Sequence, residues 1–382
     1  MNEINVLQVN KLYYPETGGI ERIVQQISEG ISDKVHVEVL VCNDKNQSKK
    51  EIIHGVYVYR TASLGMLYSM PISIMFLFKF HSMAKKKDIV HIHLPFPLAD
   101  VACFLSGYKG KVVLWWHSDI VRQKKFLLVY KPFMNALLRR ADTIIVATKG
   151  HIEGSKYLKK YENKCQIIPY GVMNSIDRDG MNYCISHKDQ KSKCIESKVV
   201  QFLFVGRLVY YKGCDVLIKA MKNAKNAYLT IVGEGNNKQE LMQLVEVLDI
   251  KDKVKFVGKV SDIEVREYLK KCDVLVLPSV ARSEAFGLVQ IEAMSYGKPV
   301  INTNLMSGVP YVSINKQTGI TVEPNNIEEL ANALQYMVDH EDERARMGEN
   351  ARERVSSCYS EETMIESLLD LYQDICKKGT KS

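Results

Sequence analysis

Apolar runs of strand length alternate with helix-like segments along most of the 382 residues. Between the first two runs, residues 19–31 place Ile20, Ile23, Val24 and Ile27 at helical spacing. Near-continuous Val, Ile and Leu strands separated by helices predict parallel sheets covered on both faces. In the first half of the chain the expected strands span residues 4–10, 35–41, 55–60, 88–93, 111–116, 142–147 and 165–169.

The length of the chain predicts two domains, because one hydrophobic core rarely grows this large. The polar, aperiodic stretch 173–198 interrupts the alternation and is predicted to be a linker or exposed loop. We therefore predict an α/β protein of two doubly wound domains, residues 1–172 and 199–358, with a cleft between them. In the second half the expected strands span residues 199–207, 227–233, 254–258, 273–279, 299–303 and 319–323, and helical patterns fill the rest.

Composition narrows the class of protein only modestly. The chain is 46% hydrophobic and 25% charged, as is typical of a globular protein, with a formal net charge of +8. That excess suits anionic small molecules, anionic lipids or nucleic acid and does not decide among them. Nine cysteines without a CxxC pair, and a start that lacks secretory signal features, predict reduced thiols in the cytoplasm.

Two strand-end loops carry candidate phosphate ligands. Gly18 and Gly19 open a helix, where unpaired backbone N–H groups favour an anion, although a plain glycine turn explains them as well. Arg207 and Lys212, in VGRLVYYKGCD, suit a diphosphate or are solvated surface cations. The dinucleotide fingerprint GxGxxG is missing here, which counts against a nicotinamide dehydrogenase.

Histidines follow or occupy two further predicted strands. His117 comes directly after the strand 111–116, where it faces the expected cleft or is simply packed. His91 and His93 would share one face of a strand, but no carboxylate or cysteine lies near them in sequence. We therefore expect no metal site there.

The stretch RSEAFGLVQIEAMSYGKP, residues 282–299, holds two glutamates eight positions apart. Glu284 lies in a loop, and Glu292 lies two turns into the following helix, so their carboxylates should be about 10 Å apart. An acid and nucleophile acting on one sugar bond need only about 5 to 9.5 Å. Between them, the N–H groups of Gly287 and Leu288 are placed to cap a phosphate. A sugar, a phosphate and a ribose in line fit a nucleotide sugar.

These residues also resemble a known family. Arg207, Lys212 and the Glu284-x7-Glu292 element with its internal Phe286-Gly287 pair are similar to those of the retaining family 4 glycosyltransferases of the GT-B fold. The resemblance extends over most of the chain. It departs from the family at IPYGV, residues 168–172, where Tyr170 replaces the more usual Asn.

The resemblance implies roles for the candidate residues. Glu284 would hold the donor sugar hydroxyls and Glu292 the ribose hydroxyls, while His117 hydrogen-bonds the donor sugar. The positions implied to be catalytic are His117, Glu284, Arg207 and Lys212, and those implied to bind the donor are Gly18, Gly19, Phe286, Gly287, Leu288 and Glu292. Domain 1–172 would take the acceptor, domain 199–358 the nucleotide sugar, and a final helix within 359–382 would pack back on the first domain. No metal or other cofactor is implied, and the DRD at 177–179 is discounted because it lies in the polar linker.

The expected activity is retaining, metal-independent transfer of a hexose in cell-surface polysaccharide synthesis. GDP-mannose is favoured as donor over a UDP-sugar, because residues 301–322 resemble bacterial polysaccharide and O-antigen enzymes. The expected acceptor is a glycan or a polyprenyl-linked saccharide. Residues 70–87 and 121–140 are apolar and basic together, so they are either core helices with a solvated cationic face or segments that lie on the inner face of an anionic membrane.

Two other classes of function stay open at this point. A nucleotide-sugar epimerase shares the two-domain architecture but needs no acceptor. A non-enzymatic protein that binds anionic surfaces would use the positive charge. It would have no need for Glu284 and Glu292 at a cationic strand end, and carboxylates repel phosphate backbones, so we expect no nucleic-acid partner.

Overall fold

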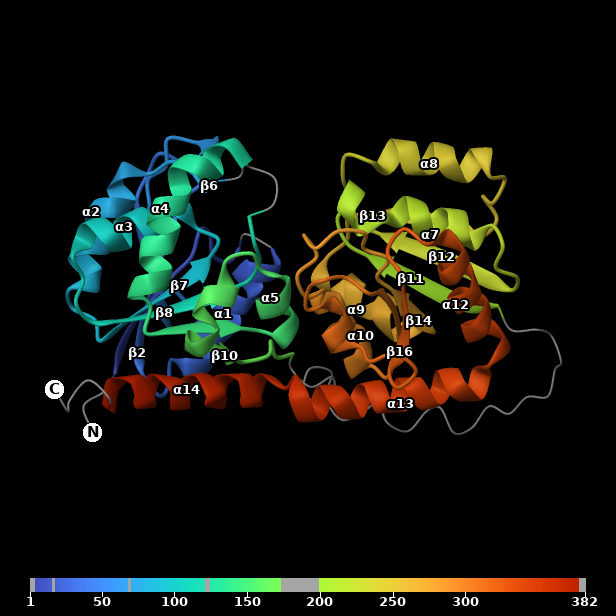
Figure 1. Ribbon diagram of the computed structural model, residues 1–382. Coiled ribbons are helices and arrows are strands. Elements are labelled where there is room, and N and C mark those ends of the chain that lie inside the picture. Colours follow the sequence, from blue (N-terminus) through green and yellow to red (C-terminus); the bar gives the residue numbers. More distant parts are fainter. Residues whose placement is uncertain (1–3, 16–17, 68–69, 121–123, 173–198, 378–382) are drawn as a thin grey trace. The chain divides into compact units, whose positions relative to one another are not determined.

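The computed structural model describes residues 4–15, 18–67, 70–120, 124–172 and 199–377. The chain forms two compact units: unit 1 holds Met1–Pro169 and Glu362–Ser382, and unit 2 holds Tyr170–Glu361. Each unit is built on one large sheet with helices on its faces (Figure 1), which confirms the predicted doubly wound α/β class. The expected linker 173–198, with its DRD, lies outside the described residues.

The sheet of unit 1 has eight strands in the order β10-β9-β8-β7-β1-β2-β4-β3, and only the pairing of β3 with β4 is antiparallel. A separate two-stranded hairpin consists of β5 and β6. The strands are β1 (Asn5–Val9), β2 (His36–Cys42), β3 (Lys49–Ile53), β4 (Val56–Thr61), β5 (Met66–Leu67), β6 (Met70–Pro71), β7 (Ile89–Leu94), β8 (Lys111–Trp116), β9 (Thr143–Val146) and β10 (Cys165–Ile167).

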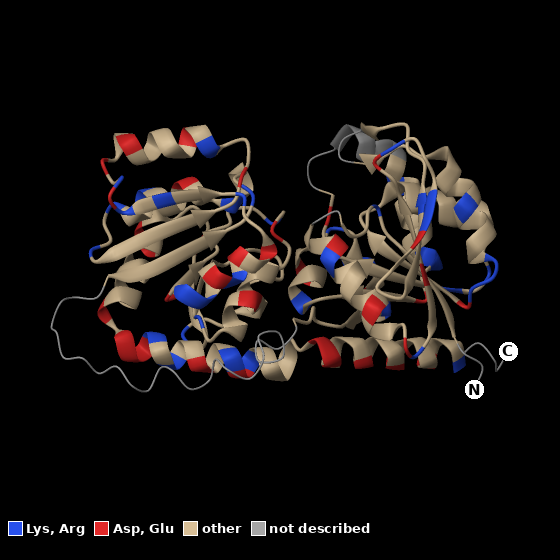
Figure 2. Cartoon of the chain, turned by 180° about the vertical axis from the view of Figure 1, so that it is seen from behind, with Lys and Arg blue, Asp and Glu red and all other residues tan. Residues whose placement is uncertain are grey.

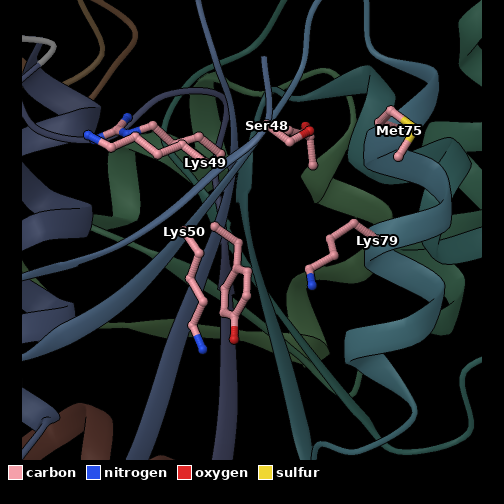
Figure 3. A pocket seen from close by; sticks show the side chains of 8 residues that line it. Ser48, Lys49, Lys50, Met75 and Lys79 are labelled. Carbon is pink, nitrogen blue, oxygen red and sulfur yellow. The ribbon is translucent and has the colours of Figure 1, made fainter.

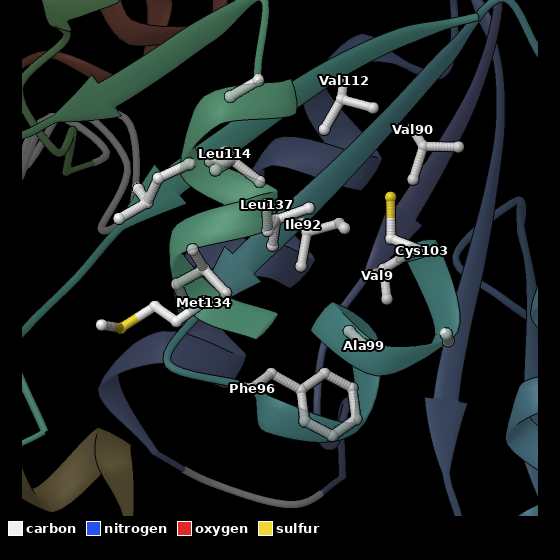
Figure 4. Close-up of a cluster of buried hydrophobic side chains, with 14 of the residues drawn as sticks. Val9, Val90, Ile92, Phe96, Ala99, Cys103, Val112, Leu114, Met134 and Leu137 are labelled. Atoms are coloured by element: carbon white, nitrogen blue, oxygen red, sulfur yellow. The ribbon is translucent and has the colours of Figure 1, made fainter. Parts of the chain in front are cut away.

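Alternate residues of these strands meet different helices. Val9, Ile92 and Leu114 face a core closed by α2, α3 and α4 (Figure 4). The intervening Gln8 hydrogen-bonds to a tyrosine of α14, the helix that returns to unit 1 at the end of the chain. The helices are α1 (Gly19–Ile31), α2 (Ile74–Ala84), α3 (Pro97–Ser106), α4 (Lys124–Arg140), α5 (Lys149–Gly154), the 3-10 helix η1 (Leu158–Lys164) and α14 (Glu361–Lys377).

The sheet of unit 2 has six parallel strands in the order β13-β12-β11-β14-β15-β16. From β11 the chain passes to β12 and β13 on one side, and then to β14, β15 and β16 on the other. The topological switch point therefore lies between β11 and β14, where open α/β sheets bind ligands. The strands are β11 (Val200–Val205), β12 (Ala227–Val232), β13 (Val254–Gly258), β14 (Val274–Val276), β15 (Val300–Thr303) and β16 (Gly319–Val322).

Helices α7, α8, α12 and α13 contribute buried apolar residues to the core on this sheet. Helix α9 begins at a capping box, in which Ser261 and Glu264 each accept a hydrogen bond from the other's backbone N–H. Residues of both charges lie along most of α13 (Figure 2). The helices are η2 (Tyr210–Lys212), α7 (Cys214–Met221), α8 (Lys238–Val247), α9 (Asp262–Lys271), α10 (Leu288–Ser295), α11 (Val309–Val312), α12 (Ile327–Asp339) and α13 (Glu341–Cys358).

The two ends of unit 2 lie side by side. The N–H of Val172 donates to the carbonyl of Tyr359 (2.8 Å), and the N–H of Glu361 donates to the carbonyl of Val172 (3.2 Å). Gly171 permits this approach, because a Cβ there would lie 2.6 Å from the Ser360 carbonyl oxygen. Unit 2 thus begins and ends at one point.

Each expected strand is found, and three short strands were not expected. Strand β3 was not expected because its sequence, KKEII, shows no regular alternation of apolar and polar residues. It is a largely exposed strand at the edge of the sheet. Pro71 splits the apolar run 64–78 into the hairpin β5–β6 and helix α2 rather than leaving one long helix. In the part of the chain that the structure describes, no helix is long and apolar enough to cross a bilayer.

Candidate functional site

The loops after β11 and β14 meet at the switch point of unit 2. The N–H of Val280 donates to the carbonyl of Tyr211 (2.8 Å), which ties the two loops together. Gly213 ends η2 with φ of 65°, and a Cβ there would lie only 2.0 Å from the carbonyl oxygen of Pro278. Only glycine allows both the left-handed conformation and this contact.

This contact brings Lys212 and Glu284 together. Their Nζ and Oε2 atoms are 2.5 Å apart, and their side chains are only 13% and 10% exposed. Ser279 donates a further hydrogen bond to the same carboxylate oxygen (3.1 Å). Two residues predicted from separate loops therefore form one partly desolvated ion pair, in which removing either partner would leave the other charge uncompensated.

Arg207 occupies the same loop as Lys212 but lies at the surface. Its guanidinium donates to the hydroxyl of Tyr211 (3.1 Å). A planar, exposed guanidinium beside a half-buried ammonium offers two kinds of cation to an anionic group. The structure thus places both predicted cations after β11, each held by a partner that the sequence did not indicate.

The E-x7-E element starts helix α10 where the sequence predicts it. Gly287 is the N-cap, with φ of 75°, and a Cβ there would lie 2.4 Å from Leu277 Cδ2. Leu288 is the first helical residue, and Glu292 lies half-buried one turn further along. The first N–H groups of α10 are therefore held at the carboxyl edge of the sheet, where they favour an anion.

Buried polar and aromatic groups behind this helix start keep it in place. The amide of Gln290 donates to the carbonyl of Phe286 (2.7 Å) and accepts from Asn302 (2.9 Å). The ring of Phe286 packs edge-on against Tyr170 at 4.8 Å and lies 6.0 Å from that of Tyr359. Tyr170, which departs from the family pattern, is thus a packing residue for the E-x7-E element.

In unit 1, Gly18 and Gly19 lie at the carboxyl edge after β1. Gly18 is the N-cap of α1, and Gly19 is its first residue, as predicted. A Cβ at Gly18 would lie 2.1 Å from a carboxylate oxygen of Glu21, so this side chain folds back against the helix start. The site suits an anion, and Glu21 itself supplies a negative charge there.

His117 lies at the end of β8 in the same unit and is 5% exposed. Its ring is stacked on Trp115 and His93, and its Nε2 is 3.0 Å from Nδ1 of His93. Burial, followed by the neighbouring His93, holds the pKa of His117 well below its usual value. His117 is therefore neutral at physiological pH and suits hydrogen bonding to a ligand rather than charge stabilisation.

The HIH pair belongs to the hydrogen-bonded surroundings of His117. His91 bonds to Tyr372 (2.6 Å), and His93 bonds to Gln8 (2.9 Å) as well as to His117. No cluster of three potential metal ligands is found in the described ranges. Sequence reasoning missed Gln8 and Tyr372, although a glutamine inside the apolar run INVLQVN was a visible irregularity.

Comparison with known proteins places this geometry in a family. The family model for glycosyl transferases group 1 matches residues 186–354, and that for glycosyltransferase family 4 matches residues 17–173. The D-rhamnosyltransferase WbpZ of Pseudomonas aeruginosa is 31% identical over 94% of this chain and 92% of its own length. The chain is a glycosyltransferase of the family that these two models describe. The family decides against the epimerase and the non-enzymatic alternatives.

Further relatives and solved structures agree with the assignment. The O-antigen chain mannosyltransferase C of Escherichia coli is 28% identical over 97% of this glycosyltransferase and 98% of its own length. The sucrose-phosphate synthase of Thermosynechococcus elongatus superposes with a TM-score of 0.78 at 22% identity, covering 98% of this chain and 99% of that one. Anabaena HepE in complex with UDP-glucose superposes with a TM-score of 0.74 at 20% identity, covering 97% of this chain and 100% of that one. The fold is therefore GT-B.

The Gly287 turn yields a first prediction. Gly287→Ala should lower the free energy of unfolding by about 2–4 kcal/mol, because it adds a clash with Leu277 to the usual cost of a left-handed alanine. Gly297→Ala is the matched control at the other end of α10. Its φ is 68°, but its nearest neighbour is an ordinary 3.6 Å away, so only about 1–2 kcal/mol should be lost. Urea unfolding followed by circular dichroism measures both, and equal losses would contradict the prediction.

Proposed function

We propose that this glycosyltransferase moves a hexose from a nucleotide sugar to a glycan or polyprenyl-linked saccharide, with retention of configuration, in O-antigen-type polysaccharide synthesis. The observation that carries the proposal is the largely buried Lys212–Glu284 pair beside the start of α10. A cation, a carboxylate and a helix N-terminus at one switch point supply ligands for a phosphate and for sugar hydroxyls.

Within this proposal the ion pair exchanges partners when the donor binds. Lys212 turns to a diphosphate oxygen, and the carboxylate of Glu284 accepts hydrogen bonds from donor sugar hydroxyls while Ser279 holds it in place. Each charge keeps a partner throughout, so neither is left desolvated and alone. Glu292, half-buried on α10, is assigned the ribose hydroxyls, and Gly18 and Gly19 are assigned to donor binding as well.

GDP-mannose is the favoured donor. A relative that supports mannose is the O-antigen chain mannosyltransferase C of E. coli, which is similar over almost the whole chain. A UDP-sugar is the second candidate, because HepE, which shares the fold, is described with UDP-glucose.

The proposed reaction needs no enzyme nucleophile and no metal. The bond from the anomeric carbon to the diphosphate breaks, and the acceptor oxygen forms the new bond on the same face. The acceptor proton passes to the departing phosphate oxygen. Arg207, Lys212 and the first N–H groups of α10 stabilise the negative charge that develops on the phosphate, while neutral His117 hydrogen-bonds the sugar.

Acceptor-dependent nucleotide release tests this function. GDP-mannose or UDP-glucose, incubated with a polyprenyl diphosphate saccharide, should release nucleotide only when the acceptor is present. The anomeric signals of the product in proton NMR should show the donor's configuration. An inverted product, or a trapped glycosyl–enzyme adduct, would contradict the proposed course of the reaction.

Substitutions of the two glutamates should have different effects on turnover and on nucleotide affinity. We expect Glu284→Gln to reduce turnover about 100-fold or more while nucleotide affinity stays or rises, because Lys212 is released towards the phosphate. Glu292→Gln should instead weaken nucleotide binding about tenfold, the effect of a lost charged hydrogen bond. Calorimetry with GDP and with UDP measures affinity, and only the cognate nucleotide should raise the unfolding midpoint appreciably.

Exposed Glu328→Gln on α12 is the control for both variants and should change neither quantity. Equal losses of nucleotide affinity in Glu284→Gln and Glu292→Gln would overturn the division of roles.

Exposed apolar and basic side chains of unit 1 support the proposal that this unit contacts an anionic lipid surface. Around the hairpin and the start of α2, large apolar side chains are 41% to 69% exposed: Leu64, Met66, Ile72, Ile74, Met75 and Phe78. Next to them a hollow of about 320 Å³ is lined by Ser48, Lys49, Lys50, Tyr59, Arg60, Thr61, Met75 and Lys79 (Figure 3). The ammonium groups of Lys50 and Lys79 lie 5.1 Å and 4.3 Å from the centre of the Tyr59 ring.

Apolar side chains beside cations match a membrane interface, which has acyl chains below and phosphates above. In the second stretch expected there, 121–140, residues 121–123 and the side chains of 124–129 lie outside the described part.

Vesicle sedimentation tests this contact. The protein should bind phosphatidylglycerol vesicles at low salt and ignore phosphatidylcholine vesicles. Lys50→Glu with Lys79→Glu should weaken binding at least tenfold, since each lysine near the surface contributes about 1 kcal/mol. The matched pair Lys255→Glu with Lys271→Glu, on unit 2, should leave it unchanged. Failure of the wild-type protein to bind anionic vesicles would refute the proposal.

A further inference from the structure

A continuous chain of hydrogen bonds runs from His117 to helix α14 through the buried interior of unit 1. Nε2 of His117 is 3.0 Å from Nδ1 of His93, and Nε2 of His93 is 2.9 Å from Oε1 of Gln8. The amide nitrogen of Gln8 donates to the hydroxyl of Tyr372 (3.0 Å), which is 2.6 Å from Nδ1 of His91. Among the described residues Nε2 of His91 has no partner, so the chain ends there.

The amide of Gln8 gives this chain a direction. Its oxygen accepts, so His93 must donate from Nε2, and a neutral His93 then accepts at Nδ1. His117 is left to donate from Nε2. On the other side, Tyr372 receives the amide hydrogen and donates its own hydrogen to His91. Every bond thus runs the same way, and one amide orientation determines them all.

This direction of the hydrogen bonds requires neutral histidine rings, and burial keeps the rings neutral. The pKa of His91 falls to about 3, and burial also lowers the pKa of His93 well below its usual value. Burial raises the pKa of the Tyr372 phenol, which therefore keeps its hydrogen. No member of the chain changes its protonation near neutral pH, so the bonds keep their donors and acceptors.

We propose that Tyr372, Gln8 and His93 are positioning residues that fix His117 as the tautomer with hydrogen on Nε2, which makes Nδ1 the ring nitrogen that accepts a hydrogen bond. The consequence for the reaction rests on the proposed role of His117 towards the donor sugar. A hydroxyl of that sugar would donate to Nδ1, and the wrong tautomer would present an N–H to it instead.

A purely structural role explains this chain of hydrogen bonds poorly. Parallel rings of His91, His93, Trp115 and His117 already stack at centroid distances of 4.7 to 6.0 Å. Apolar residues of similar shape would pack there without any need to satisfy five buried polar side chains, since replacing both partners of a hydrogen bond by apolar groups is nearly neutral for stability. The polar chain supplies what an apolar core could not, a defined hydrogen position on His117.

Nitrogen-15 NMR of histidine-labelled protein tests the tautomer directly. The two-bond correlations of His117, assigned by its loss in His117→Gln, should show hydrogen on Nε2. Tyr372→Phe removes only the hydroxyl, so the Gln8 amide loses its acceptor and His117 should become a mixture of tautomers. Turnover, measured as nucleotide release from whichever of GDP-mannose and UDP-glucose the wild type consumes, should fall roughly three- to tenfold with little change in KM.

Two further variants separate this role from simple loss of stability. Tyr108→Phe removes another buried tyrosine hydroxyl of unit 1, which donates to the Lys87 carbonyl (2.9 Å), and should leave the His117 spectrum and kcat unchanged. Gln8→Met removes the amide and should reproduce the mixed tautomer if Tyr372→Phe does not fold.

Hydrogen on Nδ1 of His117 in the wild type, or an unchanged His117 spectrum in both Tyr372→Phe and Gln8→Met, would overturn the proposal. A further outcome is that the His117 spectrum changes as expected in Tyr372→Phe and Gln8→Met while His117→Gln retains full turnover. That result would refute the proposed role of His117 in the reaction but not the control of its tautomer by the chain of hydrogen bonds.

Discussion

The ion pair between Lys212 and Glu284 depends on a backbone constraint that precedes it. In a parallel sheet every strand-to-helix loop starts at the same edge, and two of those loops diverge only at the switch point. In unit 2 these loops are locked to each other by Gly213 against Pro278 and by the Tyr211–Val280 hydrogen bond. The two charges can therefore meet in a largely buried position, because the backbone has already brought their loops into contact.

At the switch point of unit 1 the polar groups are neutral rather than charged. Its switch point lies between β1 and β7, and the polar residues Gln8 and His93 come from these two strands. Where unit 2 offers opposite charges to a charged ligand, unit 1 offers a neutral ring whose hydrogen position is set from behind. The contrast fits the proposed roles, in which unit 2 holds the phosphates and hydroxyls of the donor and His117 of unit 1 hydrogen-bonds the donor sugar.

Much of this organisation was predictable from the sequence because it rests on local patterns. The strand runs, the helix 19–31, the capping box at Ser261 and the helix start after Gly287 each follow from a few neighbouring residues. Partners far apart in sequence were not predictable. The residues around Glu284 in the sequence give no sign that Lys212 is its partner. Gln8 and Tyr372 share a hydrogen bond although 364 positions separate them. Edge strand β3 was missed because exposure removes the apolar pattern on which strand prediction relies.

The paired ends of unit 2 give the chain an unusual modularity. Because residues 170–172 and 359–361 are hydrogen-bonded neighbours, unit 2 is an insertion within unit 1, entered and left at one point. A closed segment of this kind can be exchanged or duplicated without separating the strands of either sheet. Its boundary runs through Gly171 and Tyr170, so these two residues decide whether a transplanted unit closes correctly. Recombination of whole units would therefore exchange the Lys212–Glu284 pair as one piece and leave helix α14 and the histidine chain with unit 1.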